Sequence, residues 1–199
     1  MGYDLRKLDL RRWRVADALR LTAAHQDPDM ATQGGIHDTA TAVDWIGRVA
    51  DLDNGHVYAV ADAEDHPIGC VGVTNIDRHQ VGWTWYWTVA EVRGQGVARD
   101  ALRALVNWAH HDAGLYRLEL GHRTNNPASC GVAASAGFLV EGLERGRLSY
   151  DGVRHDVERH ARLAADPLAA PARPVSITTG SAELPVADPG WKGNSARAD

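Results

Sequence analysis

The sequence has few of the features that mark membrane-spanning, disulfide-bonded or metal-binding proteins. No apolar run approaches the ~20 residues needed to span a bilayer, and the first residues lack the apolar segment of a signal peptide. The two cysteines, Cys70 and Cys130, have neither metal-ligand nor disulfide spacing, so we expect both to be reduced core residues. These absences predict a cytoplasmic protein with no membrane contact and no metal site.

Lysine is also scarce, because Lys7 and Lys192 are the only two and arginine supplies the remaining positive charge. The net charge is −5, and no basic stripe with interleaved aromatic residues occurs. This balance argues against nucleic-acid binding and is compatible with an amine-bearing substrate. A length of 199 residues, with 44% hydrophobic and 24% charged residues, fits one ordinary globular domain with an appendage.

The most informative stretch runs from residue 83 to residue 112. Tryptophan recurs at every second position of an expected strand that ends near Val89, which places three tryptophans on one strand face. A loop over residues 93–98 contains Gly94 and Gly96, and an amphipathic helix follows it. Backbone N–H groups that converge at a helix N-terminus favour a bound anion. The loop therefore predicts a phosphate-binding site.

Two common phosphate-binding loops do not fit this stretch. A dinucleotide fingerprint needs a third small residue where this chain has Arg99, and a nucleotide P-loop needs a Gly-Lys-Ser/Thr sequence that is absent. The pattern that remains is Arg-x-x-Gly-x-Ala, which begins at Arg93.

Hydrophobic periodicity and turn signals predict the other elements. A strand, a helix and a second strand around the glycine loop form a crossover unit, which predicts a parallel strand pair. Asp151-Gly152 between two alternating runs predicts a closing hairpin. The expected strands are 5–14, 56–61, 68–75, 83–89, 116–121, 138–150 and 153–163, and the expected helices are 18–26 with Asp17 as its cap, 39–51, 97–113 and 127–136 with Asn126 as its cap.

The composition changes at residue 166. The segment 166–199 holds five of the eight prolines and few bulky apolar residues, so it cannot build a core of its own. We expect a domain over residues 1–165 and a tail over 166–199. The tail is expected either to be flexible or to dock through Trp191 on the domain or on the partner subunit of a homodimer.

The order of these elements resembles the GNAT superfamily of N-acetyltransferases, and four motifs resemble its RimJ/RimL-like branch. They lie at residues 86–98, 125–129, 136–142 and 152–157, within a resemblance that covers roughly residues 8–165. The resemblance implies an α/β fold with a mixed, mostly antiparallel sheet that is splayed between its fourth and fifth strands and has helices on both faces. It also implies transfer of an acetyl group from acetyl-CoA to a primary amine by direct attack in a ternary complex, with no metal.

The resemblance further assigns residues to acetyl-CoA. The end of the fourth strand pairs with the pantetheine amides, the glycine loop holds the pyrophosphate with two flanking arginines, and an asparagine lies beside the pantetheine arm. Ser129 matches the position whose hydroxyl protonates the departing thiolate. The implied cofactor-binding residues are Trp87, Thr88, Val89, Arg93, Gly94, Gln95, Gly96, Val97, Ala98, Arg99 and Asn126.

The general base stays open, because two glutamates found in relatives correspond to Trp83 and Leu148 here. Glu119 is one candidate, and the alternative is that it is a solvated or arginine-paired strand residue. His122 and the pair His37-Asp38 are other candidates. A substrate amine of low pKa would need no dedicated base.

The acceptor site also stays open. Trp83, with Tyr86 or Trp45, either lines a slot for a planar or cationic group or belongs to a row of core tryptophans. His37 and Asp38 are further candidate acceptor-binding residues. The acceptor is either a protein N-terminus or a small amine, and a CoA-binding module without catalytic activity is the alternative function.

Overall fold

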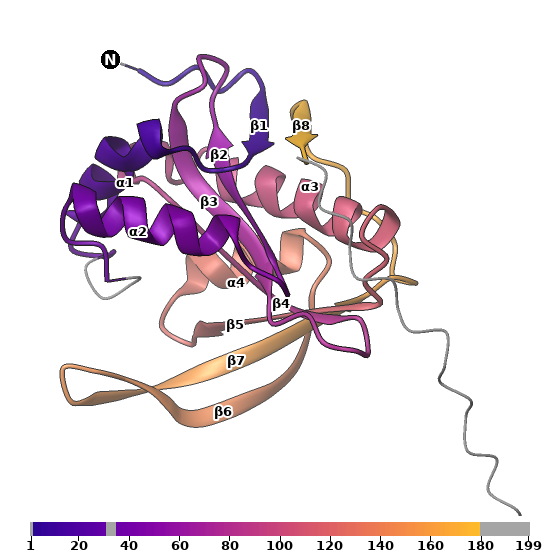
Figure 1. The fold of residues 1–199 in the computed structure, drawn as a ribbon. Helices are drawn as coiled ribbons and strands as arrows, with labels where there is room; N and C mark the ends of the chain where they lie inside the picture. The colour runs from indigo at the N-terminus through magenta and orange to yellow at the C-terminus, as the bar shows by residue number, and fades with distance from the viewer. Residues whose placement is uncertain (1, 31–34, 180–199) are drawn as a thin grey trace, which may run out of the picture.

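The computed structural model describes residues 2–30 and 35–179, which form a mixed sheet with helices on both faces (Figure 1). The strands are β1 (Leu8–Arg11), β2 (His56–Ala61), β3 (Pro67–Thr74), β4 (Val81–Thr88), β5 (Arg117–Arg123), β6 (Leu139–Tyr150), β7 (Val153–Leu163) and β8 (Val175–Thr178). The helices are α1 (Ala18–His25), α2 (Thr39–Ala50), α3 (Val97–His111) and α4 (Pro127–Ser135), with short 3-10 turns η1 (Val15–Asp17) and η2 (Ala90–Val92). Within the described residues no helix is long and apolar enough to cross a membrane.

The strand order across the sheet is β6-β7-β5-β4-β3-β2-β1-β8. Adjacent strands run antiparallel except for the pairs β4–β5 and β1–β8. Strand β4 pairs with β5 only over Val81–Trp83, and the two strands then diverge. The mixed, mostly antiparallel sheet and its splay between the fourth and fifth strands are therefore confirmed.

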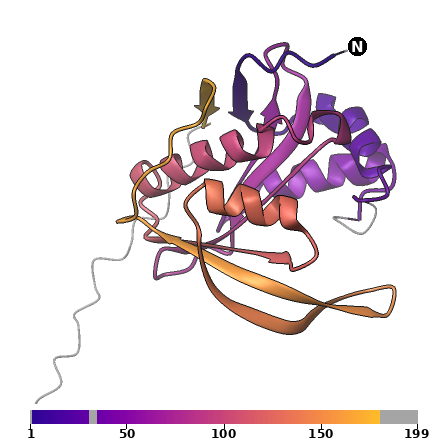
Figure 2. The same cartoon turned by 180° about the vertical axis from the view of Figure 1, so that it is seen from behind.

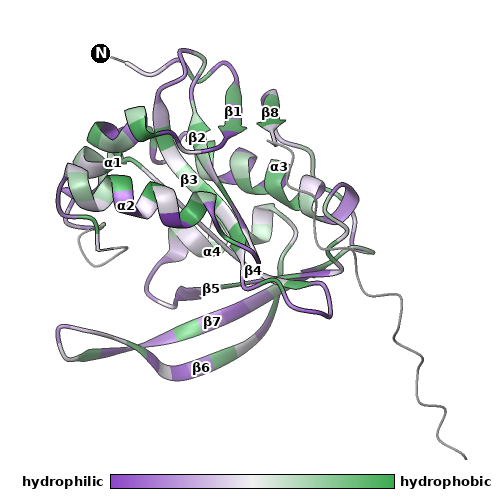
Figure 3. Cartoon of the chain, in the orientation of Figure 1, coloured by the Kyte–Doolittle hydropathy of each residue, from purple (hydrophilic) through white to green (hydrophobic). Residues whose placement is uncertain are grey.

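Helices α1 and α2 cover one face of the sheet, and α3 and α4 cover the other, as the view from behind shows (Figure 2). The apolar stripe of α3 is buried against the sheet, because its members recur at helical spacing; it contains Ala101, Leu102, Leu105, Val106 and Ala109. Hydrophobic residues concentrate along β2 and β3 and under the helices, whereas the β6–β7 hairpin carries more polar positions (Figure 3). Two hydrophobic cores, one on each face of the sheet, therefore hold the helices in place beside the splay.

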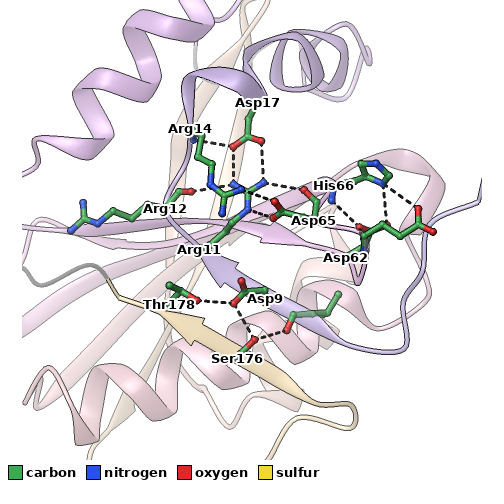
Figure 4. A network of polar contacts seen from close by, with 12 residues as sticks. Asp9, Arg11, Arg12, Arg14, Asp17, Asp62, Asp65, His66, Ser176 and Thr178 are labelled. Carbon is green, nitrogen blue, oxygen red and sulfur yellow. Dashed lines mark hydrogen bonds and ion pairs between the residues drawn. The ribbon is translucent and has the colours of Figure 1, made fainter.

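The expected turns and helix starts are mostly confirmed, with one exception at α1. The β6–β7 hairpin turns at Asp151 and Gly152, both with positive φ, as a two-residue Asp-Gly turn requires. Asp17 was expected to cap α1, but its side chain makes no cap hydrogen bond to that helix. It instead accepts two bonds from Arg11, at 2.8 and 3.0 Å, in a buried ion pair between β1 and η1 (Figure 4).

The first part of the tail lies on the domain and adds a strand that the sequence analysis did not predict. Residues 175–178 form β8, which pairs in parallel with β1. Just before it, Arg173 donates to the Asp100 carboxylate of α3 at 2.7 Å and to the Leu5 carbonyl at 3.1 Å. This part of the tail is therefore docked, whereas Trp191 lies outside the described residues.

The docked tail predicts a response to acid. Burial raises the pKa of Asp100, but the bonds that it accepts from Arg99, the Ala172 amide and Arg173 lower that pKa more, to below its usual range. Stability from a depressed carboxyl pKa is complete above the unfolded value of ~3.9 and is lost as pH falls through the folded value. We expect the thermal midpoint of the wild type to fall more steeply below about pH 4 than that of Asp100→Asn. Asp44→Asn, on the exposed side of α2, should keep the wild-type slope, and parallel curves for all three proteins would contradict the assignment.

Candidate functional site

The splay leaves one edge of β4 without a strand partner. From Thr84 to Thr88, β4 pairs with β3 on one side, and no partner on the β5 side occurs in the described part of the chain. Trp87 and Thr88, expected to contact the cofactor, lie in this segment, and the next residue, Val89, donates its amide to Ile68 on the β3 side. Free backbone groups at this edge can pair with the amides of an extended ligand.

The glycine loop lies between this strand and α3. Gly94 and Gly96 have φ values of +73° and +77°, a region that residues with a Cβ rarely adopt, and Gly96 immediately precedes the first residue of α3. The amides of Gly94, Gly96, Val97 and Ala98 donate to no protein acceptor among residues 2–30 and 35–179. Four unbonded donors at the positive end of a 15-residue helix form an anion-binding arrangement.

The arginines that flank the loop already have carboxylate partners. Arg93 bonds to Asp29 at 2.7 Å and to Asp27 at 3.0 Å, so it ties the glycine loop to the segment after α1. Arg99 bonds to its neighbour Asp100, whose side chain is fully buried. Arg173, which the sequence analysis did not single out, also reaches this loop through the Gln95 carbonyl. Positive charge near the loop therefore comes from three chain segments.

The start of α4 has the cap and the first-turn proline that the sequence predicted. Asn126 accepts the Ser129 amide at 3.1 Å through its side chain, and Pro127 is the first helical residue. Tyr86 of β4 crosses to α4 and donates its hydroxyl to the Ser129 carbonyl at 3.0 Å. Burial raises the pKa of Tyr86 to about 12, so the hydroxyl stays protonated at neutral pH. The half-buried Ser129 is thus positioned from both sides of the splay.

A cavity of about 530 Å³ lies beside the point where β4 and β5 separate. Trp83 and Glu119, which are register partners on the two strands, both line it. The guanidinium of Arg159 stacks over the Trp83 ring at 4.4 Å and also lines the cavity. Trp83 is therefore a cavity residue, whereas Trp85 and Trp87 pack against the core under α1 and α2.

Glu119 has two arginine partners. Arg117 donates to one of its oxygens and Arg159 to the other, each at 2.8 Å. Glu119 is therefore an arginine-paired strand residue, which was the alternative to its role as a general base. Its place in the cavity still allows contact with a substrate.

The remaining candidates lie apart from this cavity. Asp38 is the cap of α2 and accepts the Thr41 amide at 2.8 Å, and both Asp38 and His37 are exposed. Tyr86 packs against the core under α3 and α4, on the face of β4 opposite Trp83. Trp45 makes an edge contact with Trp13. The structure thus brings together Trp83 and Glu119 but not His37, Asp38, Tyr86 or Trp45.

Arg159 is one of several cavity residues that the sequence analysis missed, and the one that contacts both Trp83 and Glu119. It lies on β7, forty positions after Glu119, and meets Glu119 only through the β5–β7 register. The single available signal was its place in the alternating pattern of the last strand, which does not identify the neighbouring strand.

The fold and the loop define the class of protein, and the comparisons agree with them. Residues 7–139 match the family model described as an acetyltransferase (GNAT) domain, and the chain belongs to this family. It is 28% identical over 121 residues to YdaF of Bacillus subtilis strain 168, whose name places it provisionally among ribosomal N-acetyltransferases; the match covers 60% of this chain and 65% of YdaF. It is 30% identical over 101 residues to the ribosomal-protein-serine acetyltransferase of Escherichia coli strain K12, covering 50% of this chain and 56% of that protein.

The chain thus spans less than two thirds of the length of these two relatives. Among solved structures, Mycobacterium smegmatis RimJ in complex with CoA-disulfide superposes with a TM-score of 0.71 at 21% identity, over 78% of this chain and 81% of RimJ. At this identity the likeness supports the fold.

Proposed function

We propose that the protein is an acetyl-CoA-dependent N-acetyltransferase that modifies a primary amine by direct attack in a ternary complex. The observation that carries the proposal is the set of four unbonded amides between Gly94 and Ala98, at the start of α3 and beside the unpaired end of β4. This loop has the pattern by which relatives hold the pyrophosphate of CoA. The amides bind phosphate oxygens, and the free edge at Trp87 and Thr88 pairs with pantetheine amides.

The chemistry requires a neutral amine, a polarised thioester carbonyl and protonation of the departing thiolate. The neutral amine attacks the acetyl carbonyl, a C–N bond forms, and the C–S bond of the thioester breaks. A backbone N–H near Thr88 stabilises the negative charge on the carbonyl oxygen. The substrate ammonium first loses a proton to solvent, directly or through Glu119, and the nitrogen loses a second proton to solvent once the C–N bond has formed. The departing thiolate takes the hydroxyl proton of Ser129, which regains a proton from solvent.

The acceptor enters from the cavity at Trp83. The cavity contains carboxylates that attract an ammonium group, and arginines that prevent a uniformly negative surface. Its charged members are Asp77, Glu119, Glu144, Arg147 and Arg159. A protein N-terminus and a small amine both suit this mixed lining, and the names of the two curated relatives favour a ribosomal protein as the acceptor. A cytoplasmic location and a homodimer stay predictions from the sequence.

The test is release of free thiol from acetyl-CoA with a panel of amines that includes peptides with N-terminal serine or alanine, and polyamines. We expect turnover with at least one amine and none without acceptor. Gly96→Val should strongly weaken acetyl-CoA binding, because a φ of +77° disfavours a branched side chain and the loop amides would have to move. Acetyl-CoA binding without turnover on any amine would support the non-catalytic module instead.

A further inference from the structure

Four side chains with metal-binding atoms converge between α4 and the sheet. His122 comes from β5, Cys130 from α4, and Glu158 and His160 from β7. One ligand atom of each residue lies within 4.8 Å of the other three. The four positions form no short sequence motif, because the β5–β7 register and the docking of α4 bring them together. The sequence analysis therefore expected no metal site.

Two distances within this cluster match those of a tetrahedral coordination shell, and two are shorter hydrogen-bond distances that metal binding would lengthen by a few tenths of an ångström. The Nε2 atoms of His122 and His160 are 2.9 Å apart, and Glu158 Oε1 lies 2.9 Å from the His160 Nε2 and 3.5 Å from the His122 Nε2. Cys130 Sγ lies 3.7 Å from the same Glu158 oxygen. A tetrahedral zinc ion, with nitrogen and oxygen ligands near 2.0–2.1 Å and sulfur near 2.3 Å, separates its ligand atoms by about 3.3–3.7 Å.

The ring of His122 is oriented as that of a metal ligand usually is, whereas the buried Nδ1 of His160 has no hydrogen-bond partner among the described residues. His122 Nδ1 lies 3.0 Å from the Arg123 carbonyl, so this nitrogen carries the proton and the Nε2 lone pair faces the cluster. The side chains of His122 and His160 are only 6% and 1% exposed. Two imidazoles are thus removed from water with their Nε2 atoms directed at the same point.

Hydrogen bonds alone satisfy this cluster poorly. The lone pair of His122 and one oxygen of Glu158 both lie 2.9 Å from His160 Nε2, which carries at most one proton. Glu158 is 30% exposed and can also accept from water, whereas the buried Nε2 of His122 has no other donor among the described residues. The Cys130 thiol is a weak donor at a long distance from Glu158. A dication would be coordinated by all four atoms at once, which removes the shortage of protons.

We propose that His122, Cys130, Glu158 and His160 bind one divalent transition-metal ion, and that zinc is the ion that fits them best. Two imidazoles, a thiolate and a carboxylate form a closed four-ligand set of the borderline-soft kind that zinc prefers. All four positions are filled by protein, which is the arrangement of a structural site and leaves none for substrate. The ion would cross-link β5, β7 and α4, and Cys130 directly follows Ser129, so it would fix the first turn of α4 beside the splay.

A second group of possible ligands, Asp62, Glu64 and His66, lies at the β2–β3 turn and differs in two ways. Asp62 and His66 are labelled in Figure 4. The Asp62 carboxylate already accepts three backbone amides, including those of Glu64 at 3.0 Å and His66 at 2.8 Å. Glu64 is also largely exposed. The hydrogen bonds of the β2–β3 turn account for the position of Asp62 in this group. The group therefore provides a matched control for the metal-binding experiment.

The experiment uses the full chain, stripped with a chelator and then titrated with Zn²⁺ or Co²⁺ under reducing conditions. We expect one Zn²⁺ per chain by elemental analysis, a higher thermal midpoint when it is bound, and with Co²⁺ the intense visible bands of a tetrahedral site together with thiolate-to-cobalt charge transfer. Cys130→Ser should abolish the charge-transfer band, and His160→Gln should lower zinc affinity by more than the ~10–100-fold typical of losing a partner behind a ligand.

Two variants serve as controls. Cys70→Ala removes the other cysteine, which is buried under α1 and α2, and His66→Gln removes a histidine of the second group. Both should bind zinc and cobalt as the wild type does. Cys130 is only half-buried, so Cys130→Ser keeps the test decisive if His160→Gln fails to fold. Absence of stoichiometric metal, a thiolate-to-cobalt band that survives Cys130→Ser, or loss of metal binding in His66→Gln would overturn the proposal.

Discussion

Replacing Arg11 by methionine is expected to lower the free energy of unfolding by about 3–5 kcal/mol, because it leaves a buried carboxylate without its counter-charge. The side chains of Arg11 and Asp17 are 3% and 8% exposed, and two hydrogen bonds join them. Arg11 also bonds to Asp65 and to the Arg12 carbonyl (Figure 4). Urea denaturation followed by circular dichroism would measure the change as a lower midpoint with an unchanged slope.

Arg14→Met is the matched control for this prediction. Arg14 also pairs with Asp65, but the two side chains are 55% and 53% exposed. Ion pairs of this kind contribute about 0–1 kcal/mol, so the control should stay near the wild type. A double variant, Arg11→Met with Asp17→Leu, should recover part of the loss because no charge is then left buried. Equal effects of Arg11→Met and Arg14→Met would contradict the assignment of a buried ion pair.

Replacing Ser129 by alanine is expected to lower kcat by about 10²-fold or more, the usual contribution of a positioned general acid. The KM for acetyl-CoA should change little, because the Ser129 backbone amide and carbonyl, bonded to Asn126 and Tyr86, are still present in the variant. Steady-state kinetics with the best amine of the panel, together with direct measurement of acetyl-CoA binding, separates the two parameters.

Ser135→Ala provides the comparison for this variant. Ser135 lies at the other end of α4, where its hydroxyl donates to the Val132 carbonyl at 2.8 Å. It has no contact with the splay among the described residues, so kcat should stay within about twofold of the wild type. Full turnover by Ser129→Ala would show that Ser129 is not the general acid. The proposal that the glycine loop binds CoA would still stand.

Local patterns predicted those parts of the fold that depend on residues close in sequence. The Asp-Gly turn, the Asn126 cap with Pro127, and the glycines before α3 each depend on φ preferences or on bonds within a few residues. Asp17 followed the same cap rule but instead forms the buried pair with Arg11, because a tertiary ion pair offered the carboxylate a charged partner. Strand β8 was missed because four residues in a proline-rich segment gain stability only from pairing with β1.

The features of the candidate site also fall into those that depend on local sequence and those that depend on tertiary contacts. Contiguous motifs were enough to predict the glycine loop, its place between a strand and an amphipathic helix, and the start of α4, because the geometry of each is local. Other contacts could be found only in the three-dimensional fold: Arg159 pairs with Glu119 over Trp83, Arg173 reaches Asp100, and Cys130 meets two histidines and Glu158. These contacts join positions 8 to 76 residues apart through strand register and helix docking, and alternation along one strand carries no information about its neighbour.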